Sequence, residues 1–304
     1  MVESSAPELL RETDLLLAEL APASTGREPP AHVIGVTGPP GVGKSSLLSR
    51  LVSAWRTAER SVAVLAVDPS SRISGGSLLA DRARIEHNPG DRAVFIRSMA
   101  AGGRLGGLAP ATRAAAAALA VAFDVVVIET VGVGQSETDV ADVADTVAVV
   151  VQPGSGDVLQ FLKAGIMEVP DVLVVTKADL GELAQRSVAD LHAALRSLAT
   201  ADIPVLAVST LPPPSGIEQL LETFDTHLRA LDLPARRQAA RRAQALDEFA
   251  SEFGERGLRA LGGRRDARRA AERMDGRLDF RAICRELGRL AGAEHDPQPR
   301  DGTQ

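Results

Sequence analysis

Short runs of valine and isoleucine alternate with helical patterns from residue 31 to about residue 233 of the chain. These runs are apolar on both faces, which is typical of strands in a parallel sheet that helices cover on both sides. The predicted strands are Val33–Val36, Val62–Val67, Val94–Ile96, Val125–Ile128, Val147–Val151, Val172–Val175 and Val205–Val208. The pattern therefore predicts an α/β fold with a doubly wound, mostly parallel sheet.

Helical segments flank this sheet region on both sides. An amphipathic pattern predicts one helix from about Pro7 to Leu20, and the Arg- and Ala-rich end of the chain predicts helices interrupted at Gly262-Gly263. We expect a disordered tail from His295. The predicted domains are residues 1–30, a short N-terminal helix and linker; 31–233, the α/β domain; and 234–304, a C-terminal helical extension that is a candidate for dimerisation.

Composition narrows the class of protein further. The hydrophobic fraction of 45% and the charged fraction of 24% are ordinary for a globular domain, and the net charge of −6 argues against nucleic acid as a partner. The single cysteine, Cys284, allows no disulfide within the chain and fits a reducing compartment. The start lacks a leader pattern, and the most apolar stretch, Ala114–Ile128, is interrupted by Asp124 and too short to span a bilayer. We therefore expect a cytoplasmic protein without membrane association.

Lysine is rare in this arginine-rich chain and occurs only at Lys44, Lys163 and Lys177. A lysine ammonium is a compact point charge, whereas an arginine guanidinium is a planar fork. Each lysine is therefore a candidate for chemistry, and two of the three lie in motifs that bind nucleotides.

The first motif is Gly38-Pro39-Pro40-Gly41-Val42-Gly43-Lys44-Ser45, directly after the first predicted strand and before a helix. This is the phosphate-binding P-loop, G-x-x-x-x-G-K-[ST], in the context that the motif requires. Backbone N–H groups cradle the phosphates, Lys44 reaches the β- and γ-phosphate oxygens, and the Ser45 hydroxyl binds Mg²⁺. The predicted phosphate-binding residues are Gly38, Gly41, Val42, Gly43, Lys44, Ser45 and Ser46.

The second motif, Val125 to Gly132, delivers Glu129 at the carboxyl end of an apolar strand. A carboxylate there can hold Mg²⁺ through water, and the Gly132 N–H can approach the γ-phosphate, so that the segment responds to the triphosphate. Glu129 stands where small GTPases more usually have aspartate, and its longer side chain suits contact through water.

The third motif, Thr176-Lys177-Ala178-Asp179, ends the sixth predicted strand. The Asp179 carboxylate can accept hydrogen bonds from both N1–H and the amino group of guanine, whereas adenine offers no such pair, so discrimination of about 10⁴-fold is within reach. Lys177 would lie along the base plane. Ser209 and Thr210, after the seventh strand, could supply a backbone N–H to the base oxygen. Thr176 replaces the usual asparagine and lacks its amide.

Several further stretches accompany these motifs: AVDPSS at 66–71, SGGS at 74–77, LADR at 79–82, FIRSM at 95–99, LGG at 105–107 and ETVGVGQSE at 129–137. With them the chain resembles the MeaB/ArgK-type G-protein chaperones of methylmalonyl-CoA mutase, from about Gly35 to Asp179 and more loosely to Leu231. Three departures are a shorter N-terminal segment, Arg72 where proline is usual, and Thr176.

The resemblance implies a dimeric, Mg²⁺-dependent GTPase that hydrolyses GTP to GDP and phosphate. It also implies association with an adenosylcobalamin-dependent acyl-CoA mutase, whose cofactor loading the family gates and which it protects. The implied catalytic residues are Lys44, Asp68, Asp81 and Glu129, of which the three acids also serve Mg²⁺ with Ser45. A third switch that communicates with the mutase is implied at Gln152, Asp157, Gln160 and Lys163.

The residues alone support this assignment unevenly. Asp68 follows a strand and so lies at the carboxyl edge of the sheet, but spacing alone makes Asp81 an ordinary helix acid. Val133 stands where small GTPases often carry a water-orienting glutamine, which predicts slow intrinsic hydrolysis.

Three alternatives share the P-loop. A GTP-dependent metallochaperone would need a Cys/His cluster, which the scattered histidines do not predict. A small-molecule kinase could use Arg97 and Arg104 on a lid. A scaffold that does not hydrolyse GTP could bind a partner through its Arg-rich end.

Overall fold

The computed structural model describes residues 30–68, 85–100, 108–130, 140–154, 170–197 and 202–292, apart from Arg277 and Asp279. The predicted N-terminal helix and the predicted disordered tail lie outside these residues. The chain divides into two compact units, residues 1–231 and 232–304. No helix in the described part is long and apolar enough to cross a membrane.

The first unit is built on a seven-stranded parallel sheet, which confirms the predicted fold class. The strand order is β3-β2-β4-β1-β5-β6-β7. The strands are β1 (His32–Thr37), β2 (Val62–Asp68), β3 (Val94–Ala100), β4 (Val125–Thr130), β5 (Thr146–Val151), β6 (Val172–Val175) and β7 (Val205–Ala207). All seven coincide with predicted runs, and the five central strands do so because parallel strands buried on both faces need continuous apolar sequence.

Two strand ends differ from the sequence prediction. β3 continues past Ile96 to Ala100, because its whole length pairs with β2 from Val62↔Val94 to Asp68↔Ala100. Arg97 and Ser98 interrupt the apolar run, so the sequence pattern predicted an end at Ile96. The backbone pairing with β2 nevertheless continues to Ala100. β7 ends one residue earlier than expected, at Ala207.

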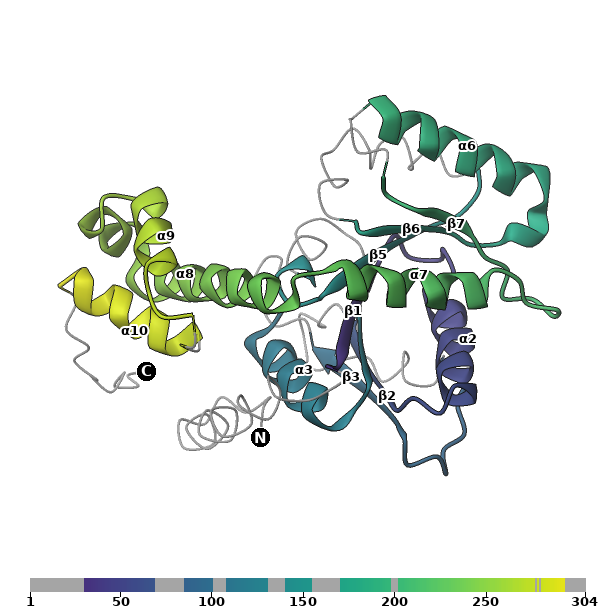
Figure 1. Ribbon diagram of the computed structural model, residues 1–304, viewed down its shortest axis with the longest axis horizontal. Helices are drawn as coiled ribbons and strands as arrows, with labels where there is room; N and C mark the ends of the chain where they lie inside the picture. Colours follow the sequence, from purple (N-terminus) through teal and green to yellow (C-terminus); the bar gives the residue numbers. More distant parts are fainter. Residues whose placement is uncertain are drawn as a thin grey trace, which may run out of the picture. The chain divides into compact units, whose positions relative to one another are not determined.

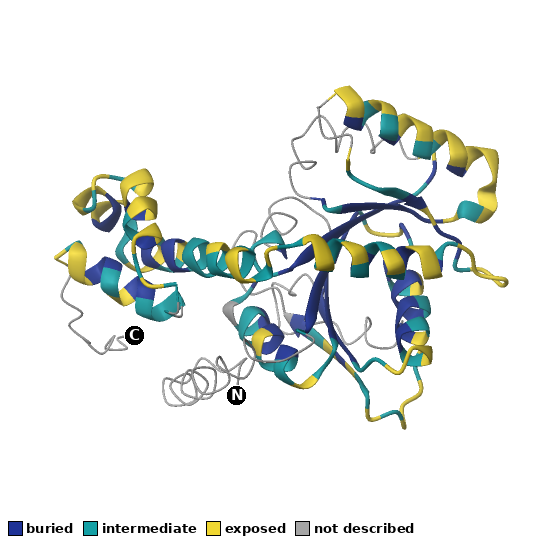
Figure 2. Cartoon of the chain, viewed as in Figure 1, coloured by how far each residue is buried: buried dark blue, intermediate teal, exposed yellow. Residues whose placement is uncertain are grey.

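Helices cover both faces of the sheet (Figure 1). The apolar cluster on one face contains side chains of α2 (Lys44–Thr57) and α7 (Ile217–Ala230). The cluster on the other face contains side chains of α3 (Pro110–Ala122) and α6 (Glu182–Ser197). The central strands β1, β2, β4, β5 and β6 are therefore buried, whereas the edge strands β3 and β7 are partly exposed, at Phe95, Arg97 and Ala207. The outer faces of the helices are exposed (Figure 2).

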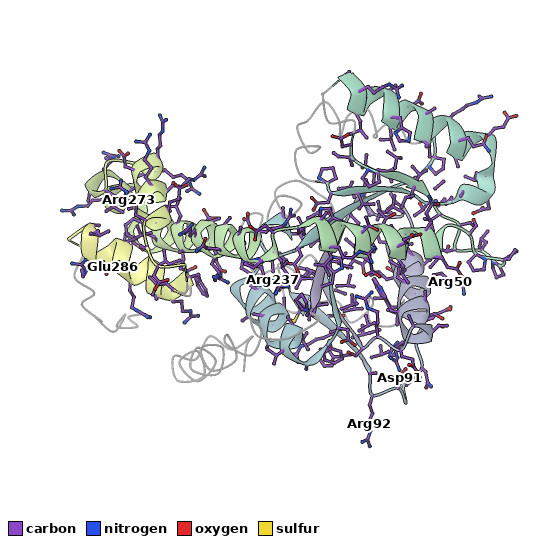
Figure 3. The ribbon with its side chains drawn as sticks, viewed as in Figure 1. Arg50, Asp91, Arg92, Arg237, Arg273 and Glu286 are labelled. Carbon is purple, nitrogen blue, oxygen red and sulfur yellow. The ribbon has the colours of Figure 1, made fainter. Side chains whose placement is uncertain are left out.

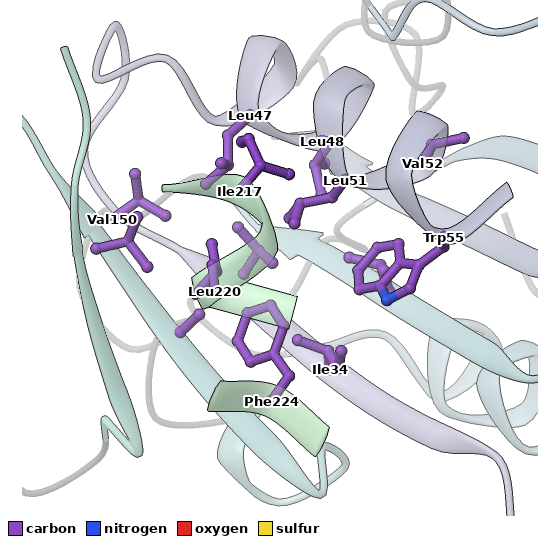
Figure 4. Packing of buried hydrophobic residues seen from close by; sticks show 14 of the residues in the cluster. Ile34, Leu47, Leu48, Leu51, Val52, Trp55, Val150, Ile217, Leu220 and Phe224 are labelled. Atoms are coloured by element: carbon purple, nitrogen blue, oxygen red, sulfur yellow. The ribbon is translucent and has the colours of Figure 1, made fainter. Parts of the chain in front are cut away.

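The core beneath α2 determines where the P-loop helix lies. Leu47, Leu48 and Leu51 are fully buried against β1 and α7, and Figure 4 shows them packed beside Ile217 and Leu220. At the far end of the helix, the rings of Trp55 and Phe224 stack with centroids 6.4 Å apart. Burial of several large side chains, at about 1.5–3 kcal/mol each, anchors the helix whose first turn faces the candidate site.

A partly buried hydrogen-bond chain at the opposite, amino ends of the strands joins β1, β5 and α7. The Thr146 hydroxyl lies 2.7 Å from His32 Nε2 and 2.7 Å from His227 Nδ1. The other ring nitrogen of His227, Nε2, lies 3.3 Å from the Asp171 carboxylate, just before β6. These side chains tie together the starts of the strands that end at the candidate site.

The second unit is helical and has an apolar cluster of its own. Its helices are α8 (Leu233–Ala260), α9 (Arg264–Glu272) and α10 (Phe280–Leu290). The predicted interruption at Gly262-Gly263 is confirmed, because both glycines have positive φ between α8 and α9. The sequence pattern missed a kink within α8 at Gly254, where φ is 60°.

Cys284 lies in this second apolar cluster on α10. Burial raises the pKa of its thiol from 9.0 to about 11, and the negative charges of Glu252 and Glu248 add to the rise. The fold therefore favours the neutral thiol, which is a poor nucleophile.

We predict that Cys284 reacts slowly with iodoacetamide at pH 8 in the folded protein. A rise of the pKa to about 11 lowers the thiolate fraction roughly a hundredfold relative to an ordinary thiol, and burial slows access further. The measurement is the alkylation rate, followed by mass spectrometry, in buffer and in denaturing urea. Equal rates in both would contradict the buried, neutral thiol.

Candidate functional site

The candidate site lies where the order of strands reverses. β1 has β4 on one side and β5 on the other, so the connections that leave β1 and β5 diverge at the carboxyl edge of the sheet. Ligands of open α/β sheets bind in the crevice that such a divergence creates. The loop from Gly38 to Gly43 enters this crevice and leads directly into α2.

Glycines determine the path of this loop. Gly38 has φ of 147°, and a Cβ there would lie 2.1 Å from the carbonyl oxygen of Val150 in β5. Gly43, with φ of 95°, is the N-cap residue of α2, and no side chain caps the helix. The first turn of α2 contains no acidic residue, so its N–H groups and positive dipole end remain available to an anion.

The ammonium of Lys44 is folded back into the loop. Lys44 is 6% exposed, and its Nζ donates hydrogen bonds to the carbonyl oxygens of Gly38 at 2.7 Å and Pro39 at 3.0 Å. A buried ammonium needs such acceptors, because an uncompensated charge is costly in the interior. Phosphate oxygens are stronger acceptors for a cation than neutral carbonyls, so the same ammonium is suited to hold a phosphate.

Ser45 and Glu129 approach each other from the two elements beside the loop. Ser45 lies in the first turn of α2 and Glu129 lies near the end of β4, and the Ser45 hydroxyl is 3.4 Å from a carboxylate oxygen of Glu129. Hard oxygen ligands with this spacing fit Mg²⁺, whose neighbouring ligands lie about 3 Å apart in an octahedron. The carboxyl end of β2 places the backbone of Asp68 at the same edge of the sheet.

Thr176 connects the base motif to the phosphate loop. Its hydroxyl lies 2.6 Å from the carbonyl oxygen of Val42 and 3.1 Å from that of Val151, and its side chain is buried. Because a hydroxyl has one hydrogen, the shorter contact with Val42 is the better donor bond. Threonine thus still links β6 to the P-loop, although it lacks an amide.

Lys177 and Asp179 follow on a tight turn. Lys177 has a left-handed backbone, with φ of 55°, directly before the short 3₁₀ helix η3 (Ala178–Leu180). Its Nζ donates a hydrogen bond to Gln152, just after β5, so the base motif touches the first residue of the predicted third switch. The carboxylate of Asp179 is exposed and accepts a hydrogen bond of 2.8 Å from the hydroxyl of Ser209.

One detail of the predicted base site is wrong. The backbone N–H of Ser209 does not face a base, because it donates to the carbonyl oxygen of Ser215 at 3.0 Å, in an antiparallel bridge across the proline-rich bend. Within the described part of the chain, the N–H of Thr210 donates no hydrogen bond. Of the two residues named from the sequence, only Thr210 has a backbone N–H that stays a candidate for this contact, and the hydroxyl of Ser209 bonds to Asp179.

The remaining predicted site residues lie in segments that the structure does not describe: Asp81, Gly132, Asp157, Gln160 and Lys163. The predicted site residues that it does describe lie at the carboxyl edge of the sheet: Gly38, Gly41 to Ser46, the backbone of Asp68, Glu129, Gln152, Thr176, Lys177, Asp179, Ser209 and Thr210. The sequence missed the carbonyl of Val42 as the acceptor for Thr176, since no motif marks a backbone acceptor.

The parallel sheet, the glycine loop and the buried lysine define a protein of the P-loop nucleotide-binding class. The family model described as "Methylmalonyl Co-A mutase-associated GTPase MeaB" matches residues 1–260. The chain therefore belongs to the MeaB family, which confirms the resemblance inferred from its motifs.

Curated relatives agree with this assignment. A putative GTPase of Pyrococcus abyssi is 42% identical over 227 residues, covering 72% of this chain and 69% of the relative. A putative GTPase of Caulobacter vibrioides is 43% identical over 249 residues, covering 80% and 74%. A mitochondrial methylmalonic aciduria type A homolog of Caenorhabditis elegans is 37% identical over 224 residues, covering 70% and 56%.

Solved structures share the fold. One described as a LAO/AO transport system kinase superposes with a TM-score of 0.61 at 27% identity, covering 96% of this chain and 90% of that one. HypB from Helicobacter pylori in complex with nickel reaches 0.52 at 19% identity, covering 72% and 95%, which is a likeness of fold alone.

We predict that Gly38→Ala destabilises the protein and abolishes nucleotide binding, because its Cβ would overlap the Val150 carbonyl oxygen, which the sheet holds in place. Urea unfolding should show a loss well above about 1 kcal/mol. The matched control is Gly41→Ala in the same loop, where φ is 79° but no heavy atom lies within 4 Å of the added Cβ. Equal losses for both variants would contradict the close approach to β5.

Proposed function

We propose that this chain is a GTP-hydrolysing chaperone that gates the loading of adenosylcobalamin into an acyl-CoA mutase and protects that mutase. The family to which the chain belongs is described as methylmalonyl-CoA mutase-associated, and a relative is named for methylmalonic aciduria. Methylmalonyl-CoA mutase or a close relative is therefore the proposed client. The protein acts in the cytoplasm as a homodimer, in which the helices of residues 234–304 are the candidate contact.

The observation that carries the proposal is the bond from Thr176 to Val42. This bond fixes the base motif to the phosphate loop, so that one ligand with a base and a phosphate chain fits both. Lys44 exchanges the carbonyls of Gly38 and Pro39 for the β- and γ-phosphate oxygens, and the N–H groups of the loop and of the first turn of α2 complete the cradle.

The base is proposed to be guanine. The Ser209 hydroxyl occupies one side of the Asp179 carboxylate and leaves its other lone pairs for a ligand with two adjacent N–H donors. Guanine presents such a pair at N1 and at its exocyclic amine, whereas adenine presents an acceptor at N1. Lys177, two residues before Asp179, bonds to Gln152, and its stem is proposed to lie along the base.

Mg²⁺ is the proposed cofactor of hydrolysis. Ser45 and Glu129 would hold it, together with Asp68 and Asp81. When bound, Mg²⁺ neutralises the charge that develops on the phosphates during transfer to water. Lys44 stabilises the same charge from the loop, and Gly132 is proposed to donate its N–H to the γ-phosphate.

The third predicted switch provides the proposed route to the client. Gln152 begins this switch and accepts a hydrogen bond from Lys177 of the base motif. A movement of Lys177 on nucleotide binding would therefore alter the contact with Gln152. Asp157, Gln160 and Lys163 are proposed to continue the switch toward the mutase. Intrinsic hydrolysis is slow, with turnover below about 1 s⁻¹, so that binding of the client can control the rate of GTP hydrolysis by accelerating it.

We predict that Asp179→Asn shifts base preference from guanine toward xanthine. An amide at this position donates to the xanthine oxygen at C2 and no longer accepts from the guanine amine, so affinity for GDP should fall about 10²-fold or more. Competition titration against a fluorescent nucleotide, with GDP, XDP and ADP, measures the shift. If the unmodified protein binds ADP as tightly as GDP, the guanine assignment is wrong.

We also predict that the chain binds purified methylmalonyl-CoA mutase in a nucleotide-dependent way. Association should differ between GDP and a non-hydrolysable GTP analogue, and Lys44→Ala should remove the difference, because the phosphates lose their cation. Arg186→Ala, which removes an exposed pair with Glu182 on α6, is the control and should behave like the unmodified protein. A mutase that shows no association in either nucleotide state would contradict the proposed client.

A further inference from the structure

Three threonine residues bury their hydroxyls in the first unit. They are Thr37 at the end of β1, Thr130 at the end of β4 and Thr112 in the first turn of α3. Their exposed fractions are 0%, 1% and 0%, and within the described part of the chain no group forms a hydrogen bond with any of the three hydroxyls. A buried hydroxyl without a partner destabilises the fold, so a partner other than the chain itself is expected.

Strand pairing places Thr37 and Thr130 side by side. The parallel register of β1 and β4 runs to Val36↔Glu129, one residue before the two threonines. Neighbouring strands lie about 4.8 Å apart, and side chains alternate between the faces of the sheet. Ile128, two residues before Thr130, belongs to the apolar cluster that contains α3, so both threonines face that cluster.

α3 brings Thr112 to the same place. Thr112 precedes the buried Ala115 and Ala116 by three and four residues, so it lies on the stripe of the helix that faces the sheet. α3 ends just before β4 begins, so the two run antiparallel, and α3 packs on β4 and its neighbours β1 and β2. The helix rises about 15 Å from Thr112 to its last residue and β4 spans about 16 Å, which brings Thr112 level with Thr130. Figure 3 shows α3 on the side of the sheet away from α2, the helix that carries Arg50.

We propose that Thr37, Thr112 and Thr130 bind one internal water molecule between β1, β4 and α3. A buried water typically makes about three hydrogen bonds to polar groups that would otherwise be unsatisfied, and three hydroxyls supply that number. Each hydroxyl donates or accepts as the water requires. The three groups are neutral and so fit a neutral ligand, whereas a divalent cation would need carboxylates or carbonyls. The inference goes beyond the proposed function and does not depend on it.

The water lies beneath the two strand ends that carry the candidate site. Thr37 directly precedes Gly38 of the phosphate loop, and Thr130 directly follows Glu129. The side chain of Glu129 points to the other face of the sheet, where it meets the hydroxyl of Ser45. The water therefore connects the ends of β1 and β4 from the face opposite the oxygens that are candidates for Mg²⁺.

A site without water predicts changes of the opposite sign. Valine has nearly the shape of threonine but lacks the hydroxyl. If no water is bound, valine removes an unpaired polar group from an apolar environment, and the protein becomes more stable. If water is bound, valine leaves that water one hydrogen bond short, and the protein becomes less stable.

The experiment is urea unfolding of the unmodified protein, Thr112→Val, Thr130→Val and the double variant. Each single change should raise the equilibrium constant for unfolding about fivefold, the effect of one lost hydrogen bond. The double variant should raise it by clearly less than the product of the two effects, because both changes act on the same water.

Thr57→Val is the matched control. Thr57 ends α2, and its hydroxyl bonds to the carbonyl oxygen of Ser53 in an exposed position, so this change should alter the unfolding constant less than about twofold. An unchanged or lower unfolding constant for Thr112→Val and Thr130→Val would overturn the inference. Effects that simply multiply in the double variant would also overturn it, since they would show no shared ligand.

A second measurement needs no variant and decides the matter even if the variants do not fold. A high-resolution crystal structure of the unmodified protein should show one water about 2.8 Å from each of the three hydroxyl oxygens. Apolar packing at this position, hydroxyls bonded directly to one another, or a protein group in the place of the water would contradict the proposal.

Discussion

The ammonium of Lys44 is buried inside its own loop. The burial of this charge depends on the loop path and on the order of the strands in the first unit. A charge in this position requires oxygen acceptors at short range, and the carbonyls of Gly38 and Pro39 provide them. That arrangement requires a glycine at Gly38, because the loop passes too close to Val150 of β5 for any side chain. It also requires β1 to deliver the loop between β4 and β5, which the strand order achieves.

The second half of the site depends on the first. The Thr176 hydroxyl bonds to the Val42 carbonyl within the P-loop. Arg50 on α2, the helix that follows this loop, bonds to the Thr210 carbonyl in the loop after β7. The predicted phosphate and base sites are thus both connected to the P-loop and to α2, which the apolar core anchors against β1 and α7. The contact of Lys177 with Gln152 joins the base motif to the start of the segment proposed to meet the client.

The sequence predicted those features that repeat a local pattern. The apolar runs marked the strands, most clearly the five central ones, whose two faces are both buried. The spacing from Gly38 to Ser45 marked the loop because glycine and lysine are needed at fixed positions. It could not predict pairings between distant polar groups. The contact of Arg50 with Thr210 and the Thr146 hydroxyl between two histidines join positions that only the folded chain brings together. The bond of the Ser209 N–H to Ser215 is local, but no motif marks it.

The central claim is that the buried lysine and the base motif serve one guanine nucleotide. A crystal structure of the protein with GDP and Mg²⁺ tests this most directly. The account predicts that the Lys44 ammonium leaves the carbonyls of Gly38 and Pro39 for a β-phosphate oxygen, while Asp179 contacts the guanine edge and the bond from Thr176 to Val42 persists. A nucleotide bound elsewhere, with Lys44 still on both carbonyls, would contradict it.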